Sequence, residues 1–208
     1  MIGDWYRRHV GSRIVNAVCS HPKLTEQRHH VVPHAEGVVV EIGIGTGLNL
    51  THYDPKKVRH VIGVNPPDGL TALVDFHRLH GAISGELVLE SAEAMSLDSG
   101  LADTIVITYT MCSIPDIAAA VAEMRRVLKP GGRLLFCEHG RADDARTARW
   151  QDRLNPAWKA VAHGCHLNRT PGALLEAGGF TLAEERRYPI PGVPSVLGFH
   201  HAGVAKPR

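Results

Sequence analysis

An apolar, β-branched run near residue 40 passes directly into three glycines at every second position. Residues 38–42 predict a buried strand, and Gly43, Gly45 and Gly47 follow it. Because glycine has no Cβ, such a turn lets backbone N–H groups approach a ligand closely. A dinucleotide-binding turn has its third glycine three positions after the second, but Leu48 stands there in this chain. The pattern therefore predicts a cofactor-binding turn of another kind and counts against a nicotinamide oxidoreductase.

Length and charge are those of one globular domain, which we expect to span residues 1–208. The 208 residues carry a formal net charge of +2 with His neutral, so we expect no nucleic-acid partner. Neither a signal peptide nor an 18-residue apolar run is evident, which predicts a cytoplasmic, reduced protein without a stable membrane anchor. Both a monomer and a homodimer are compatible with the sequence.

The four cysteines include no C-x-x-C pair. Cys112 and Cys137 lie in apolar runs and are expected to be small buried hydrophobic residues. Cys165 stands between His163-Gly164 and His166, which makes it a candidate metal ligand. One short loop offers too few ligands without a second cluster, so we expect no metal.

Strands alternate with helices through the centre of the chain. We expect strands at 37–42, 59–65, 86–91, 102–110 and 132–138, and helices at 46–53, 69–80 and 115–128. This alternation predicts an α/β fold with a parallel sheet covered on both faces. Two late strands, at 180–188 and 196–205, are expected to form a hairpin on one sheet edge.

Three parts of this domain are expected to have different tasks. Residues 1–35 are interpreted as a helical lid over the substrate, whose first helix ends at His21-Pro22. Residues 36–140 are interpreted as the cofactor-binding core. Residues 141–208 would supply acceptor-site helices, at about 143–163 and 172–177, and the C-terminal strands.

A series of motifs resembles a known family. In order, they are Glu41-Ile42-Gly43-x-Gly45-Thr46-Gly47-x-Asn49, Met111-Cys112-Ser113, Arg125-Arg126-Val127-Leu128-Lys129-Pro130-Gly131-Gly132, Phe136-Cys137-Glu138-His139, Pro156-x-Trp158-Lys159, Gly164-Cys165-x-Leu167-x-Arg169 and Gly198-Phe199-His200. The first resembles the cofactor turn of class I S-adenosylmethionine (SAM) methyltransferases. The whole series resembles the methyltransferase-like 7 family of small-molecule thiol S-methyltransferases and its bacterial relatives. The family's animal members have an N-terminal hydrophobic anchor, which we do not find here.

The resemblance implies a Rossmann-like sandwich with a mostly parallel seven-stranded sheet and a C-terminal antiparallel hairpin. It implies SAM as cofactor, S-adenosylhomocysteine as product, a small-molecule acceptor and no metal. The residues implied to contact SAM follow the first four strands: Glu41, Gly43, Gly45, Thr46, Gly47, Asn49, Asn65, Pro66, Ala92, Glu93, Met95, Thr108, Tyr109 and Thr110. In this assignment the residues from Ala92 to Met95 hold the adenine, and Thr108 to Met111 lie under the sulfonium.

Asn65 departs from the family pattern, which has an acid that accepts from both ribose hydroxyls. Its amide offers one acceptor oxygen, so Asn65 is either a weaker ribose contact or a turn former before Pro66. Asp68 is a substitute acid if the turn folds back.

A Glu-His pair leaves the fifth strand, and this pair is the candidate catalytic group. His139 would be a general base oriented by Glu138, or else a structural histidine. His200 and His201 are further candidates on opposite faces of the last strand. The expected acceptor pocket consists of Met111, Cys112, Trp158, His163, His166 and His201.

Two alternatives to a thiol methyltransferase stay open. The first keeps the fold and changes the acceptor, to oxygen, nitrogen or carbon of another small molecule such as a phenol or quinol precursor. The second is a non-catalytic SAM-binding module, for which Asn65 is the best argument. The DNA and protein amide methyltransferases have Asn/Asp-Pro-Pro-aromatic after the fourth strand, and this chain does not.

Overall fold

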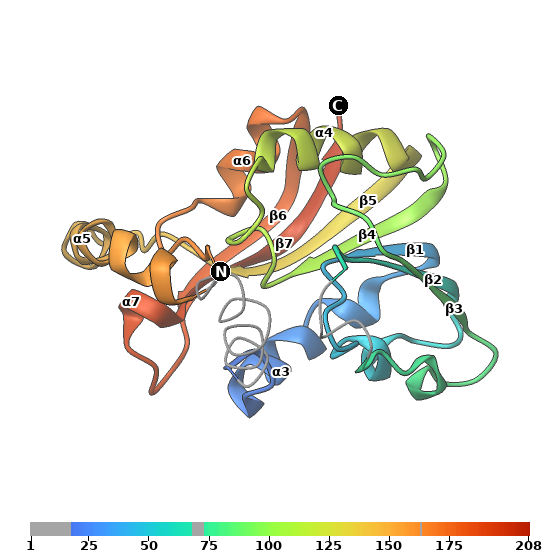
Figure 1. The fold of residues 1–208 in the computed structure, drawn as a ribbon, viewed down its shortest axis with the longest axis horizontal. Coiled ribbons are helices and arrows are strands. Elements are labelled where there is room, and N and C mark those ends of the chain that lie inside the picture. The colour runs from blue at the N-terminus through green and yellow to red at the C-terminus, as the bar shows by residue number, and fades with distance from the viewer. Residues whose placement is uncertain (1–17, 68–72, 163) are drawn as a thin grey trace.

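A single mixed sheet organises the computed structural model, which describes residues 18–67, 73–162 and 164–208. Its strands run in the order β3-β2-β1-β4-β5-β7-β6 (Figure 1). Their bounds are β1 Gly37–Ile42, β2 Val58–Val64, β3 Ser84–Val88, β4 Ala102–Thr108, β5 Leu128–His139, β6 Phe180–Pro189 and β7 Phe199–Pro207. The first five are parallel, and β7 pairs antiparallel with both β5 and β6. The expected Rossmann-like sandwich with a C-terminal hairpin is confirmed.

Helices cover both faces of this sheet (Figure 1). On one face α4 (Ile117–Val127) and α6 (Pro171–Ala177) pack over alternate residues of the central strands, as the shared hydrophobic core shows. The other face packs against residues 31–35, which follow α3 (Pro22–His29). Beyond one end of the strands lie α5 (Ala145–Val161) and α7 (Ser195–Gly198). Among the described residues, none of these helices has the length and apolarity needed to cross a bilayer.

The expected helices after β1 and β2 are corrected by the structure. Residues 46–53 form turns and one short 3-10 helix, Leu50–His52, because the glycines before it adopt positive φ angles and Pro55 follows. Of residues 69–80, the described part from 73 contains no α-helix: Leu73 and the segment Phe76–Arg78 are 3-10 helical. The cofactor turn is therefore followed by loops rather than by a long helix.

A helix, α3, begins at Pro22, where the sequence predicted that a helix ends. Pro22 occupies the first position of α3, where a missing N–H leaves no hydrogen bond unmade. Residues 1–17 of the expected lid lie outside the described residues. Near the other end, residues 195–198 form α7, so the last strand begins at Phe199 rather than at residue 196.

Gly203 on β7 stands beside an irregularity of β6 between Leu182 and Glu184. A Cβ at Gly203 would collide with the Glu184 carbonyl oxygen. We expect Gly203→Ala to lower the free energy of unfolding by about 2–3 kcal/mol, since backbone must move to relieve the overlap.

The matched control is Gly131→Ala. Gly131 has a φ of 79°, and no described atom lies within 4 Å of the position that an added methyl group would take. Its cost should be the conformational one alone, about 1 kcal/mol. Urea unfolding measures both variants, and equal losses would contradict the steric explanation.

Candidate active site

The glycine turn lies at the carboxyl end of β1, beside the end of β2. The N–H groups of Gly43 and Ile44 donate to the Val64 carbonyl oxygen at 2.8 and 3.4 Å. Gly43, Gly45 and Gly47 all have positive φ angles, which favour glycine. The chain therefore turns sharply directly after β1, at the edge where open α/β sheets bind ligands.

The three glycines have different steric surroundings. A Cβ at Gly43 would overlap the Thr110 side chain, and one at Gly47 would meet the Leu50 side chain at 2.6 Å. At Gly45 the nearest described atom is the Gly43 carbonyl oxygen, 3.9 Å away. Gly43 and Gly47 are thus needed for packing within the chain, whereas a side chain at Gly45 would meet open space.

Hydrogen bonds of Glu41 hold residues that follow the glycine turn. Its Oε1 accepts from Asn49 Nδ2 at 3.1 Å and its Oε2 from the Tyr53 hydroxyl at 2.7 Å. Asn49 Nδ2 also donates to Thr108 Oγ1 at 3.0 Å, which links the turn to the end of β4. Burial raises the pKa of Glu41 to about 7, although both hydrogen bonds lower it. Three of the predicted cofactor residues therefore form one buried hydrogen-bonded group.

Asn65, at the end of β2, lies against the turn. Its Oδ1 accepts from the Gly45 N–H at 3.3 Å, and its Nδ2 donates to the Pro66 carbonyl at 2.8 Å. In the next loop Ala92 and Met95 are buried in the core. Glu93 accepts from the Asp116 N–H at 2.6 Å and from Ser91 Oγ at 2.9 Å. The structure brings Asn65 to the glycine turn, and Glu93 to the start of α4. Asp68 lies outside the described residues.

Tyr109 turns the chain at the end of β4. Its φ of 53° is in the left-handed region, which non-glycine residues seldom adopt. This turn directs the N–H groups of Thr110 and Met111 at Glu138 Oε1, which accepts both at 2.8 and 3.1 Å. The loop expected under the sulfonium is thus held by a carboxylate from β5.

Glu138 itself is fully buried, and burial raises its pKa to about 7. Both of its hydrogen bonds are with the loop after β4. Adjacent residues of a strand point to opposite faces, so the side chain of His139 points away from that of Glu138. Glu138 Oε2 has no hydrogen-bond partner among the described residues. As observed, Glu138 positions the loop rather than the imidazole of His139.

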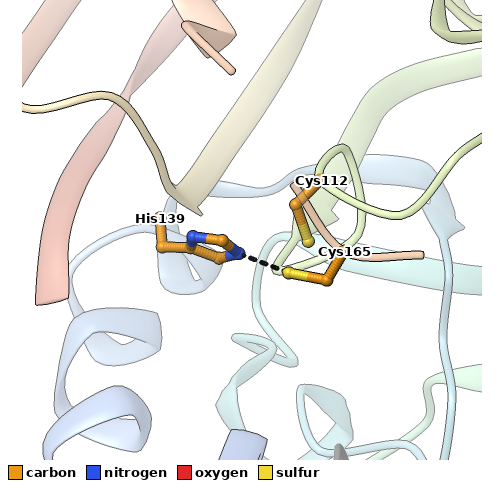
Figure 2. Close-up of side chains that lie close together, drawn as sticks. All are labelled: Cys112, His139 and Cys165. Atoms are coloured by element: carbon orange, nitrogen blue, oxygen red, sulfur yellow. Dashed lines mark hydrogen bonds between the residues drawn. The ribbon is translucent and has the colours of Figure 1, made fainter. Parts of the chain in front are cut away.

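The imidazole of His139 lies beside the sulfur atoms of Cys112 and Cys165 (Figure 2). Its Nε2 is 3.1 Å from Cys165 Sγ, and Trp158 Nε1 donates to the same sulfur at 3.3 Å. The ligand atoms of Cys112, His139 and Cys165 all lie within 4.8 Å of one another. A hydrogen bond with Cys112 and burial raise the pKa of Cys165. The structure therefore gives Cys165, a candidate ligand that lacked a second cluster in the sequence, two further potential ligands.

The two histidines of β7 point to opposite faces and bond within the protein. His200 Nδ1 lies 3.0 Å from the Gly198 carbonyl, which requires a donor, so Nε2 accepts from the Tyr109 hydroxyl at 3.1 Å. Burial lowers the pKa of His200 to about 4, which keeps the ring neutral. His201 Nε2 bonds the Arg141 carbonyl at 2.8 Å.

His166 and His163 complete the predicted acceptor residues. The backbone N–H of His166 donates to the Cys112 carbonyl at 2.8 Å, and burial lowers the pKa of its ring. His163 lies outside the described residues.

Two arginines that were not among the predicted site residues complete the region. Arg28, from α3, lies 4.7 Å from the centre of the Tyr109 ring, and its charge lowers the pKa values of Glu41 and Glu138. Arg169 donates to the Met111 and Ile114 carbonyls. Arg169 belongs to one of the later motifs, which was a usable signal, whereas nothing in the pattern around Arg28 indicated its role.

Comparison with known proteins agrees with this geometry. The family model described as "Methyltransferase domain" matches residues 40–136. Rat (Rattus norvegicus) thiol S-methyltransferase TMT1B is 31% identical over 173 residues, 82% of this chain and 70% of that protein. The malonyl-[acyl-carrier protein] O-methyltransferase of Methylococcus capsulatus is 31% identical over 82% of this chain and 61% of its own length. A SAM-dependent methyltransferase of Leishmania major has the same fold, with a TM-score of 0.70 at 14% identity over 98% of this chain and 81% of that one.

Fold, turn and comparisons together define a class I SAM-dependent methyltransferase, and the chain belongs to this family. Within the family it is a relative of the TMT1 thiol S-methyltransferases, as the motif series predicted. Membership implies SAM as the cofactor. The backbone at Gly45 is open enough to fit such a ligand, because no described atom lies closer than 3.9 Å to the position that a Cβ would take there.

We expect Gly45→Ala to weaken SAM binding at least about tenfold, since its methyl group enters the ligand's space. Stability should fall by only about 1 kcal/mol, the cost of a positive φ without glycine. The matched variant Gly47→Ala should instead lower stability further, because its methyl group meets Leu50. Calorimetric SAM titration and urea unfolding separate the two effects. Unchanged affinity in a folded Gly45→Ala would contradict the assignment of the turn.

The raised pKa of Glu41 predicts a pH-dependent stability. Its pKa is about 7 in the folded chain against an ordinary 4.5, so the folded state holds an extra proton between these values. Stability from this proton is complete below about pH 4.5 and is lost as pH rises through 7, by on the order of 3 kcal/mol. Glu41→Gln should lack this portion of the decline. Urea unfolding of both proteins from pH 5 to 8 measures it, and a constant difference would contradict the prediction.

Proposed function

We propose that this methyltransferase acts on the thiol of a small molecule and releases a methyl thioether and S-adenosylhomocysteine. The observation that carries the proposal is the relationship to a thiol S-methyltransferase over 82% of the chain. The chemistry of the region after β4 supports it: Met111 and Cys112 are buried there, and Trp158 and Cys165 are in hydrogen-bond contact. Such soft, weakly polar side chains suit a sulfur acceptor better than a charged or strongly polar one.

The cofactor supplies a methyl group activated by a sulfonium charge. Around it, the chain's own residues would bind, orient and exclude water. The backbone at Gly45 and the amide of Asn65 would hold the cofactor at the ends of β1 and β2. Glu138 fixes the amides of Thr110 and Met111, so the loop that faces the acceptor is already in place before reaction.

A thiol acceptor needs little assistance from the protein to lose its proton. A small thiol has a pKa of about 8.5 and is partly ionised at neutral pH. His200 is a poor candidate base, because burial lowers its pKa to about 4 and both ring nitrogens have protein partners. His139 Nε2 faces the sulfur cluster and stays the candidate proton acceptor.

The test is S-adenosylhomocysteine release from SAM with thiophenol, phenol and aniline, three acceptors that differ in one atom. We expect thiol turnover to exceed phenol turnover by on the order of a hundredfold, because a thiolate is both better populated at pH 7 and more nucleophilic. Gly45→Ala is the control that assigns the activity to this site.

Preferred turnover of phenol would contradict the thiol assignment and favour an oxygen acceptor, as in the Methylococcus relative. Binding of SAM without turnover of these or of alkyl thiols would favour the non-catalytic module. We also propose that the protein works in the cytoplasm, which fractionation of the native host would test.

A further inference from the structure

Three side chains that bind soft metals converge from three separate segments. Cys112 follows β4, His139 ends β5 and Cys165 follows α5. Their ligand atoms lie within 4.8 Å of one another, and Figure 2 shows the imidazole and the two thiols directed at a common centre. Two thiols and an imidazole are one of the donor sets that bind zinc in proteins.

The spacing is close to that of a tetrahedral zinc site. Ligand atoms around such an ion lie about 3.5–4 Å apart, given Zn–S and Zn–N bonds of about 2.3 and 2.0 Å. His139 Nε2 and Cys165 Sγ are now 3.1 Å apart, as in a hydrogen bond, and would separate by about half an ångström.

The backbone around the three ligands is held by hydrogen bonds. The carbonyl of Cys112 accepts from the His166 N–H at 2.8 Å, which joins the two cysteine loops directly. Arg169 binds the carbonyls on either side of Cys112, at Met111 and Ile114. Trp158 Nε1 donates to Cys165 Sγ at 3.3 Å, the kind of outer hydrogen bond that stabilises a metal-bound thiolate.

We propose that Cys112, His139 and Cys165 bind a zinc-class divalent cation through three protein ligands, and that the acceptor thiol takes a fourth position. Zinc sites with three protein ligands are characteristic of catalysis, because the remaining position binds water or substrate. The described residues offer three ligands at this centre. The metal site stands on this geometry alone, whereas the role of the acceptor rests on the proposed function.

The acceptor step balances without another reagent. The acceptor thiol releases its proton to solvent as its sulfur bonds to the cation. The bound sulfur then forms a bond to the methyl carbon while the bond from that carbon to the sulfonium breaks, and the electron pair goes to S-adenosylhomocysteine. The neutral thioether is a weaker ligand than a thiolate and leaves. In this arrangement His139 is a ligand rather than a base.

Cobalt(II) is the probe of the metal site, used on the metal-free full-length chain with a phosphine reductant and no SAM. We expect intense thiolate-to-cobalt absorption that saturates at one cobalt per chain and disappears when zinc is added. Cys112→Ser and Cys165→Ser should each weaken cobalt binding on the order of a hundredfold or more.

The control is Cys137→Ser, the same exchange at a buried cysteine whose sulfur contacts the Tyr109 hydroxyl at 3.6 Å. It should leave the absorption unchanged. Absence of the absorption in the wild-type chain overturns the site, whether or not the serine variants fold. So does absorption that persists in both cluster variants.

The acceptor position has its own test on the cobalt-loaded chain. 2-Mercaptoethanol should shift the cobalt spectrum, and ethylene glycol, in which a hydroxyl replaces the thiol, should not. No shift with the thiol overturns the role given to the acceptor. A shift of the cobalt spectrum with the thiol, without methyl transfer to thiophenol, phenol or aniline, would contradict the proposed function and leave the metal site intact.

Discussion

Two buried carboxylates at the ends of β1 and β5 hold the loops on which the rest of the site depends. Glu41 binds the residues after the glycine turn, and Glu138 binds the amides after β4. Burial of a carboxylate is unfavourable unless hydrogen bonds and opposite charge compensate for lost water. Arg28 supplies such charge to both, and it comes from α3, outside the sheet. Formation of the site is thereby coupled to docking of this N-terminal helix.

The sheet could be predicted from the sequence because its strands are β-branched runs that end in recognisable turns. The parallel sheet followed from the alternation of strands and helices, and the seven strands with a C-terminal antiparallel hairpin followed from the family resemblance. The helices expected after β1 and β2 are absent from the described residues. After β1 the reason is local, because apolar spacing does not show that Gly43, Gly45 and Gly47 take positive φ angles. Similarly, Pro22 looks like a helix breaker in the sequence, yet at the first helical position it is favourable.

The sequence predicted which segments form the candidate site more accurately than it predicted the contacts between their side chains. Neighbours in sequence such as Glu138 and His139 suggest a pair, but a strand directs them to opposite faces. One then holds the loop after β4, and the other faces two cysteines. Cys112 and Cys165 each looked isolated, because a ligand set drawn from three loops has no characteristic spacing in the chain. Only the fold, which brings the ends of β4, β5 and α5 together, reveals them as a group.

The contacts of His139 suit the ligand role proposed for it. Trp158 Nε1 donates to Cys165 Sγ, and the same sulfur lies 3.1 Å from His139 Nε2, so the Cys165 thiol is placed to donate to this imidazole nitrogen. The lone pair that a general base needs is then already engaged. A cation that replaces the thiol proton uses the same lone pair and the same sulfur in nearly the same positions. The contact that engages this lone pair in the metal-free chain is therefore close to the geometry that the proposed metal site requires.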